Sequence, residues 1–260
     1  RSPNAPNQRV TGLFNNPNYL GMWLSLCLPF GISLLKLAKR KASRIVLYII
    51  NIFILYFAIS TNSRNALLGI LISILLIFGI RRIIYFSFFL LAGLFLFNIL
   101  LPNFINFNDS YLYTKLVNFN LIARMNIWQN AINLIYQQPL LGWGAGTFPY
   151  LNKIIGADNY QHTHNLFIEL AYNFGIPLAF LVSSTVISIF IKSFNMIKRL
   201  DKSSSEYSIY TTFFASFSVF LTAHMTDVTY YDGRISLIFA VLLAGFLNFI
   251  EEKNNFKIVK

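Results

Sequence analysis

Long apolar runs restrict the fold of this chain more than any other feature of its sequence. An α-helix needs about 20 apolar residues to cross about 30 Å of hydrocarbon. A composition of 56% hydrophobic and 12% charged residues also lies outside the range of soluble globular domains. The pattern predicts an all-α, polytopic integral membrane helix bundle. About seven runs qualify as transmembrane helices, the shortest with help from flanking polar residues: 20–37, 45–60, 66–80, 83–101, 166–191, 208–225 and 235–250.

Basic residues lie at the ends of these runs rather than on one soluble face. The formal net charge of +12 therefore does not indicate nucleic-acid binding. The connections alternate in charge as the positive-inside rule requires, which predicts that the side richer in Lys and Arg faces the cytoplasm. The N-terminus is then outside and the C-terminus inside. The clusters on the cytoplasmic side are Lys36 to Arg44, Arg81 and Arg82, Lys192 to Lys202, and Lys253 to Lys260.

The predicted organisation is a single membrane domain over residues 1–260. It divides into an outer segment at 1–19, four transmembrane helices within 20–101, a large outer loop at 102–165, three transmembrane helices within 166–250, and a cytoplasmic tail at 251–260. The first residue is Arg1 rather than methionine, and the opening residues lack the pattern of a signal peptide. We therefore expect the C-terminal part of a longer chain.

The large outer loop contains one regular element that the sequence predicts. Residues from Leu121 to Gln138 show helical spacing and end before Pro139, which indicates an amphipathic helix lying on the membrane. Its apolar positions are Leu121, Met125, Trp128, Ala131, Ile132 and Ile135. The following GWGAG run, residues 142–146, predicts a tight turn, because it lacks the strand and helix that a dinucleotide-binding loop needs.

Four arginines lie beside predicted helix ends on the outer face, against the inward bias of the other basic residues. They are Arg9, Arg64, Arg124 and Arg234. One interpretation is that they extend to lipid phosphates. The other is a binding site in which planar guanidinium groups contact diphosphate oxygens at two points. The sequence leaves both open.

All three histidines, His162, His164 and His224, also fall at or near the outer surface. Histidine is the side chain best suited to accept a proton near neutral pH. His162 and His164 lie together in QHTHN, where the outer loop enters the next apolar run. They could equally be interface residues, or half of a metal site.

No metal is expected at these histidines. Cys27 lies inside an apolar run, and the outer carboxylates are scattered without ligand spacing. These carboxylates are Asp109, Asp158, Asp227 and Asp232. Glu169 falls in the first turn of the helix after QHTHN, where it either complements the helix dipole or orients a histidine.

These residues lie in segments that resemble the O-antigen ligase and O-antigen polymerase superfamily, integral membrane proteins of bacterial surface-polysaccharide assembly. The segments are RVTGLFNNPNYLG from Arg9, TNSRNALLG around Arg64, RMNIWQNAINLIYQQPLLGWGAGTF from Arg124, and His164 and Asn165 with the later Gly175. The chain departs from the family pattern at two positions. Leu178 stands where the family often has a second glycine, and Asn65 replaces the glycine of an S-R-G-A turn.

The resemblance implies a metal-independent membrane glycosyltransferase without a cofactor, in the bacterial inner membrane, with its large loop in the periplasm. Its donor would be a glycan linked to polyprenyl diphosphate, and its acceptor lipid A-core, a growing polysaccharide or a protein. His164 would be the general base or orient the acceptor, while Arg124, Arg64 and Arg9 bind the donor diphosphate. The remaining residues assigned to substrate binding are His162, Asn165, Glu169 and Arg234.

Two other functions fit the same sequence. Some members of the superfamily have been linked to bicarbonate uptake. The alternative is therefore a transporter of bicarbonate or another anion, or a transporter related to polysaccharide. The near absence of ionisable residues inside the apolar runs argues against it, and anion uptake into proteoliposomes without a glycan donor would support it. A noncatalytic scaffold would tolerate changes at the outer arginines and histidines.

Overall fold

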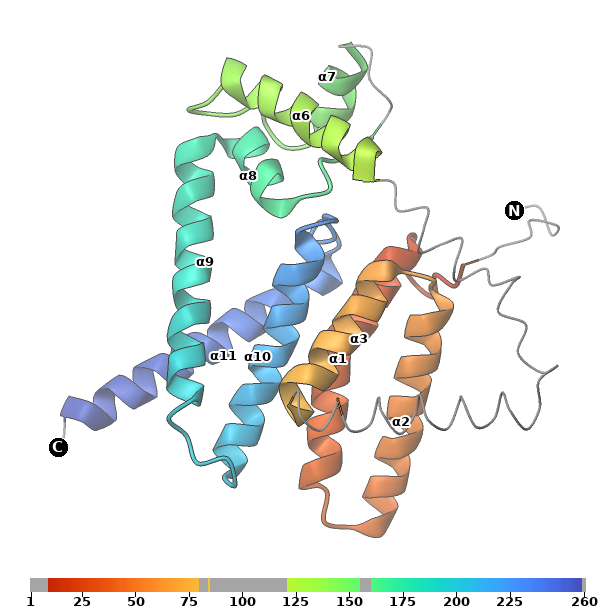
Figure 1. Ribbon diagram of the computed structural model, residues 1–260, viewed down its shortest axis with the longest axis vertical. Coiled ribbons are helices and arrows are strands. Elements are labelled where there is room, and N and C mark those ends of the chain that lie inside the picture. The colour runs from red at the N-terminus through yellow and green to blue at the C-terminus, as the bar shows by residue number, and fades with distance from the viewer. Residues whose placement is uncertain (1–8, 80–83, 85–120, 155–159, 259–260) are drawn as a thin grey trace.

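The computed structural model describes residues 9–79, 84, 121–154 and 160–258, and within them every regular element is an α-helix. This confirms the all-α prediction. The helices are α1 (Pro17–Leu37), α2 (Lys41–Ser60), α3 (Arg64–Phe78), α6 (Leu121–Gln137), α7 (Phe148–Ile154), α8 (Leu166–Phe174), α9 (Ile176–Ile197), α10 (Ser205–His224) and α11 (Gly233–Ile258), as Figure 1 shows.

Small residues bring α1, α3 and α10 into close contact. A Cβ on Gly21 of α1 would lie 2.8 Å from the Cβ of Ala66 in α3, and one on Gly69 would lie 2.8 Å from the Cβ of Ser25. Side chains larger than these would push the helices apart. The Ser25 hydroxyl donates to the carbonyl of Ala66 at 3.1 Å, and Ser216 of α10 donates to α1 in the same way. The hydroxyls of Ser25 and Ser216 are thus satisfied by carbonyls of neighbouring helices.

The outward faces of the bundle are apolar, as a lipid-solvated protein requires. α2 buries only Asn51 and Ala58, and most of its isoleucine and phenylalanine side chains are exposed. Among the residues that the structure describes, four helices are long and apolar enough to cross a membrane: Pro17–Leu37, Lys41–Ser60, Ile176–Ile197 and Gly233–Glu252. α3 is apolar but shorter, with 15 residues. The chain is therefore an all-α helical membrane protein.

The predicted count of seven transmembrane helices is not confirmed. The run at 83–101, and the outer loop up to residue 120, lie outside the described residues apart from Ile84. The run at 166–191 is wrong as a single helix, because it breaks at Gly175 into α8 and α9. Gly175 has a φ of 83°, which ends α8, and the membrane-crossing helix begins only at Ile176.

Polar segments gather at the two ends of the bundle. The upper end in Figure 1 carries the starts of α1, α3 and α11, the end of α10, and α6 to α8. At the lower end, the ends of α1 and α3 meet the link between α9 and α10 around a cavity of about 900 Å³, lined by Lys36 and Lys202 among others. Two of the clusters predicted to be cytoplasmic therefore share one end of the molecule.

The amphipathic helix predicted at 121–138 is present as α6, but its packed face differs from the predicted one. Ala131 and Ile135 are buried as expected, together with Ile127 and Leu134, against α7 and α8. Met125 is 60% exposed and Ile132 is 41% exposed. The buried face of α6 differs because the helix packs against α7 and α8, rather than on a membrane surface alone.

Candidate functional site

The QHTHN segment, residues 161–165, forms a turn that is fastened at the start of α8. Asn165 caps this helix: its side-chain oxygen accepts from the N–H groups of Phe167 at 3.0 Å and Ile168 at 3.2 Å. Its side-chain amide donates to the carbonyl of Met225 at 3.1 Å, just after α10. One asparagine thus fixes the histidine turn to the end of a buried helix.

Glu169 holds the residue between the two histidines. Its carboxylate is buried and accepts the backbone N–H of Thr163 at 2.8 Å, the hydroxyl of Tyr231, and the side-chain amide of Asn173 at 3.4 Å. Burial and the hydrogen bond to Glu169 raise the pKa of Tyr231, so its phenol remains a donor. Glu169 therefore shapes the backbone of the turn.

His164 faces Asp227, which lies in the link between α10 and α11. The distance from His164 Nδ1 to Asp227 Oδ1 is 3.2 Å. In the tautomer that fits this contact, Nδ1 donates to the carboxylate and Nε2 keeps a free lone pair. His164 also has a φ of 56°, unusual for a residue with a side chain. The turn therefore holds one imidazole in a fixed direction.

Asp227 is held in its charged form although it is buried. Burial raises its pKa, but the hydrogen bond from His164, the charges of both histidines and the N–H of Val228 lower it, with a net result below the ordinary value. Its second oxygen accepts the side-chain amide of Asn18 at 3.0 Å. The carboxylate thus joins α1, the α10–α11 link and the histidine turn.

His162 lies beside the same carboxylate. Its Nε2 is 4.0 Å from Asp227 Oδ1, and its ring centroid is 4.3 Å from that of His164. Burial and the neighbouring His164 lower its pKa, and Asp227 and Glu169 only partly oppose this. His162 is therefore harder to protonate than a free histidine.

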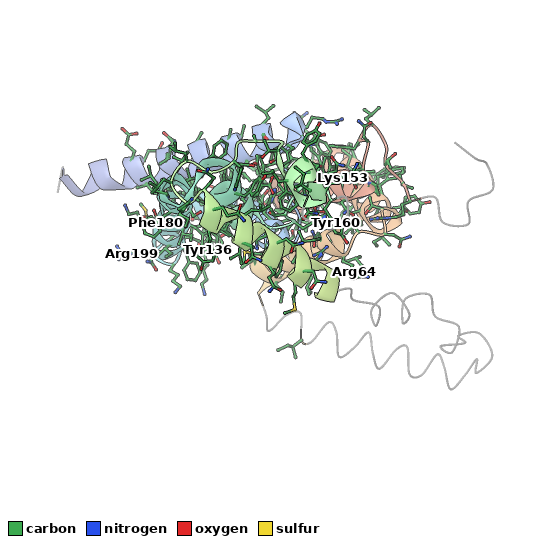
Figure 2. All side chains as sticks on the ribbon, turned by 90° about the horizontal axis from the view of Figure 1, so that it is seen from above. Arg64, Tyr136, Lys153, Tyr160, Phe180 and Arg199 are labelled. Atoms are coloured by element: carbon green, nitrogen blue, oxygen red, sulfur yellow. The ribbon has the colours of Figure 1, made fainter. Side chains whose placement is uncertain are left out.

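Arg124 and Arg64 lie near this cluster. Burial lowers the pKa of Arg124, the charge of Asp227 raises it, and the charge of Arg64 lowers it again. Figure 2 looks down on this end and shows Arg64 near the start of α6, the part of the helix that carries Arg124. Arg64 is exposed at the first residue of α3, where the helix dipole disfavours a cation. Two guanidinium groups of like charge are thus held within electrostatic range of each other.

The other two arginines make structural contacts. Arg9 donates to the carbonyl of Thr61 at 2.8 Å and to the side chain of Asn18 at 2.7 Å, which links it through Asn18 to Asp227. Arg234 forms a two-point ion pair with Asp232, with one contact at 2.7 Å, and its guanidinium stacks on Phe14. Arg9 therefore belongs to the hydrogen-bond network around Asp227, whereas Arg234 contacts Asp232 and Phe14 instead.

The glycine-rich segment positions α6 over the site. Gly142, Gly144 and Gly146 all have positive φ, which confirms the predicted tight turn. A Cβ on Gly142 would lie 2.6 Å from the backbone nitrogen of Gly175, so these two segments of the chain are in direct backbone contact. The N–H of Trp143 donates to the carbonyl of Tyr172 at 2.8 Å. The loop is thus docked on the break between α8 and α9.

The sequence pattern does not identify Asp227 as a site residue. It is one of four carboxylates scattered along the sequence, yet it forms part of the one His, Cys, Asp and Glu cluster with metal-ligand spacing found among the described residues. That argument against a metal therefore fails for Asp227. Its only signal was a position in a short link between two predicted helices, because 63 residues separate it from His164. Of the predicted residues, the structure gathers His162, His164 and Asn165 in one turn and Glu169 in the helix that follows it, with Arg124, Arg64 and Arg9 around them.

Comparison with known proteins relates the chain to proteins of bacterial polysaccharide synthesis. Over 192 residues, 67% of this chain, the sequence is 27% identical to the teichuronic acid biosynthesis protein TuaE of Bacillus subtilis (strain 168). The chain spans 39% of the length of that relative. The profile of the family described as O-antigen ligase matches residues 49–183, just over half of the chain, which includes Arg64, Arg124 and the histidine turn. The chain belongs to the O-antigen ligase family.

Proposed function

We propose that this protein is a metal-independent glycosyltransferase that moves a glycan from polyprenyl diphosphate to an acceptor at the periplasmic face of the bacterial inner membrane. The observation that carries the proposal is the 3.2 Å contact between His164 and Asp227, with Arg124 and Arg64 nearby. These groups supply a proton acceptor and positive charge, which are the two requirements of the reaction.

The donor is expected to bind through its diphosphate. Arg124 and Arg64 repel each other, so a multiply charged anion between them would be stabilised by both. Planar guanidinium groups bind phosphate oxygens at two points, which fixes the direction of the sugar. Arg9 holds Asn18 and the α2–α3 turn beside them, and thereby supports the start of α3. The polyprenyl chain of the donor would remain in the bilayer.

Transfer then needs one base. His164 Nε2 takes the proton of the acceptor hydroxyl, the acceptor oxygen forms a bond to the anomeric carbon, and the bond from that carbon to the diphosphate oxygen breaks. Asp227 accepts from Nδ1 and stabilises the imidazolium that forms. The polyprenyl diphosphate leaves with the bonding electrons, and the arginines balance its charge. A diphosphate is a good leaving group, so the reaction requires no strong acid.

The acceptor is expected to be a carbohydrate chain. The relative from Bacillus subtilis is named for teichuronic acid biosynthesis, which favours a growing polysaccharide over lipid A-core or protein. A transporter is less well supported, because the ionisable residues of the described region gather at the helix ends rather than within the membrane-crossing helices.

Deletion of the gene and complementation with variants tests this function. Wild-type protein and Lys153→Ala, a change at an exposed residue of α7, should restore the surface glycan, whereas His164→Ala should not, at equal abundance in the membrane. Loss of long chains identifies a polymerase, and loss of attachment identifies a ligase. Normal glycan in the His164→Ala strain would exclude the proposed base.

A further inference from the structure

Three potential metal-binding side chains converge at the centre of the site. His162, His164 and Asp227 each offer one ligand atom, and these atoms all lie within 4.8 Å of one another. Asp227 Oδ1 is 3.2 Å from His164 Nδ1 and 4.0 Å from His162 Nε2. Ligands bound to tetrahedral zinc at about 2.1 Å are separated by about 3.4 Å. The three atoms therefore need only small movements to coordinate one ion.

The tautomer of His162 determines whether its Nε2 can bind a cation at this point. Its Nδ1 is buried and has no hydrogen-bond partner in the described part of the chain. When Nδ1 carries the single proton of the neutral ring, the lone pair of Nε2 faces the Asp227 carboxylate. Two acceptors that face each other are repulsive, and a cation between them removes the repulsion.

We propose that His162, His164 and Asp227 form a binding site for a divalent transition-metal ion of the zinc type, and that the bound ion inhibits transfer. Two imidazole nitrogens and one carboxylate oxygen are ligands that such ions prefer, whereas Mg²⁺ prefers oxygen alone. The binding is independent of the proposed function. The inhibition rests on it.

Inhibition follows from the tautomer of His164. A metal on Nδ1 displaces the proton of the neutral ring to Nε2, so that nitrogen has no lone pair with which to take a proton from the acceptor. The ion also occupies Asp227 Oδ1, which would otherwise stabilise the imidazolium. The ring remains neutral and keeps its single proton, but the base is blocked.

Neighbouring charges determine how tightly the ion binds. Glu169 lies close enough to affect His162 and adds to the attraction for a cation, while Arg124 is close enough to Asp227 to oppose it. We therefore expect reversible binding. Cys27 lies within α1, in the membrane-crossing part of that helix, so the ion at the site has no thiolate ligand.

Titration of the purified, chelator-treated protein with Co²⁺ and Zn²⁺ tests the binding without an activity assay. Co²⁺ should give the visible absorption of a low-coordinate site without thiolate bands, and calorimetry should show one Zn²⁺ site that Mg²⁺ does not fill. His162→Gln and Asp227→Asn should each weaken binding by about tenfold or more. Asp232→Asn is the matched control, because Asp232 lies in the same link but pairs with Arg234.

The control should bind Zn²⁺ like the wild-type protein. Absence of a site in the wild-type protein, or unchanged binding by His162→Gln, would overturn the inference. His162→Gln decides the matter if Asp227→Asn does not fold.

An assay of glycan transfer in the presence of Zn²⁺ separates this inference from the proposed function. Zn²⁺ should stop transfer by the wild-type protein, a chelator should restore it, and His162→Gln should need about tenfold more Zn²⁺ for the same fractional inhibition. Binding without inhibition would overturn the inhibitory role. An active His164→Ala variant would overturn the proposed base and leave the binding result intact.

Discussion

Replacement of Gly175 by alanine should detach the glycine-rich loop around Gly142 from the break between α8 and α9. Gly175 ends α8 with φ 83° and ψ 162°, and Gly79 ends α3 in nearly the same conformation, with φ 80° and ψ 150°. A Cβ on Gly79 would meet no atom of the described residues within 4 Å, whereas a Cβ on Gly175 would collide with the carbonyl of Leu140 and lie 2.9 Å from the nitrogen of Leu141. Gly79→Ala is therefore a matched control for backbone strain alone.

The contacts of the two glycines determine how far the two variants should differ in stability. Alanine in this backbone conformation costs about 1–3 kcal/mol at either position. At Gly175 the loop must also move away, and three backbone hydrogen bonds are then lost, at about 1 kcal/mol each. Gly175→Ala should therefore be less stable than Gly79→Ala by about 3 kcal/mol. The three bonds run from Ile176 to Pro139 at 2.8 Å, from Trp143 to Tyr172 at 2.8 Å, and from Gly144 to Asn173 at 3.0 Å.

Thermal unfolding of the two variants in detergent, followed by tryptophan fluorescence, measures this difference. Trp143 lies in the loop that must move, so its signal should change before the global transition in Gly175→Ala only. The variant should also lose transfer activity, because α6 carries Arg124. Equal destabilisation by both alanines would refute the docking of the loop on the helix break.

Three further predictions concern the site and its sidedness. Arg124→Lys should lower transfer by about tenfold or more at unchanged abundance, since a lysine cannot make a two-point contact with diphosphate; wild-type rates would favour lipid anchoring. Glu169→Gln should destabilise the protein by about 1–3 kcal/mol in thermal unfolding, because an amide presents a donor to groups that already donate. In a Cys27→Ser background, a membrane-impermeant maleimide should label Tyr150→Cys from outside but not Ser203→Cys, and the reverse pattern would contradict the proposed topology.

The sequence predicted the helices whose signal is local. Apolar runs located α1, α2, α3 and α10 to within a few residues, as well as the start of α11, and helical spacing located α6. The break at Gly175 was not predicted, because a single glycine inside an apolar run is compatible with a continuous helix. The break depends on the loop around Gly142, which is distant in sequence.

The site was predictable only in part for the same reason. The histidine turn and Arg124 lie in segments that resemble a known family. Asp227 joins the site only in the folded chain, because its neighbours His164 and Asn18 come from distant parts of the sequence. The contacts of Arg234 with Asp232 and Phe14 depend equally on the fold, and they favour a structural role that charge and position did not indicate.

A double-mutant cycle on the rate of glycan transfer tests the central claim most directly. The protein is reconstituted in proteoliposomes with a polyprenyl-diphosphate-linked glycan, and release of polyprenyl diphosphate is measured for His164→Gln, Asp227→Asn and the double variant. Because the two residues act as one unit, each single change should lower the rate by about 100-fold or more, and the double change should lower it no further. A wild-type rate in either single variant, or losses that multiply in the double variant, would contradict the account.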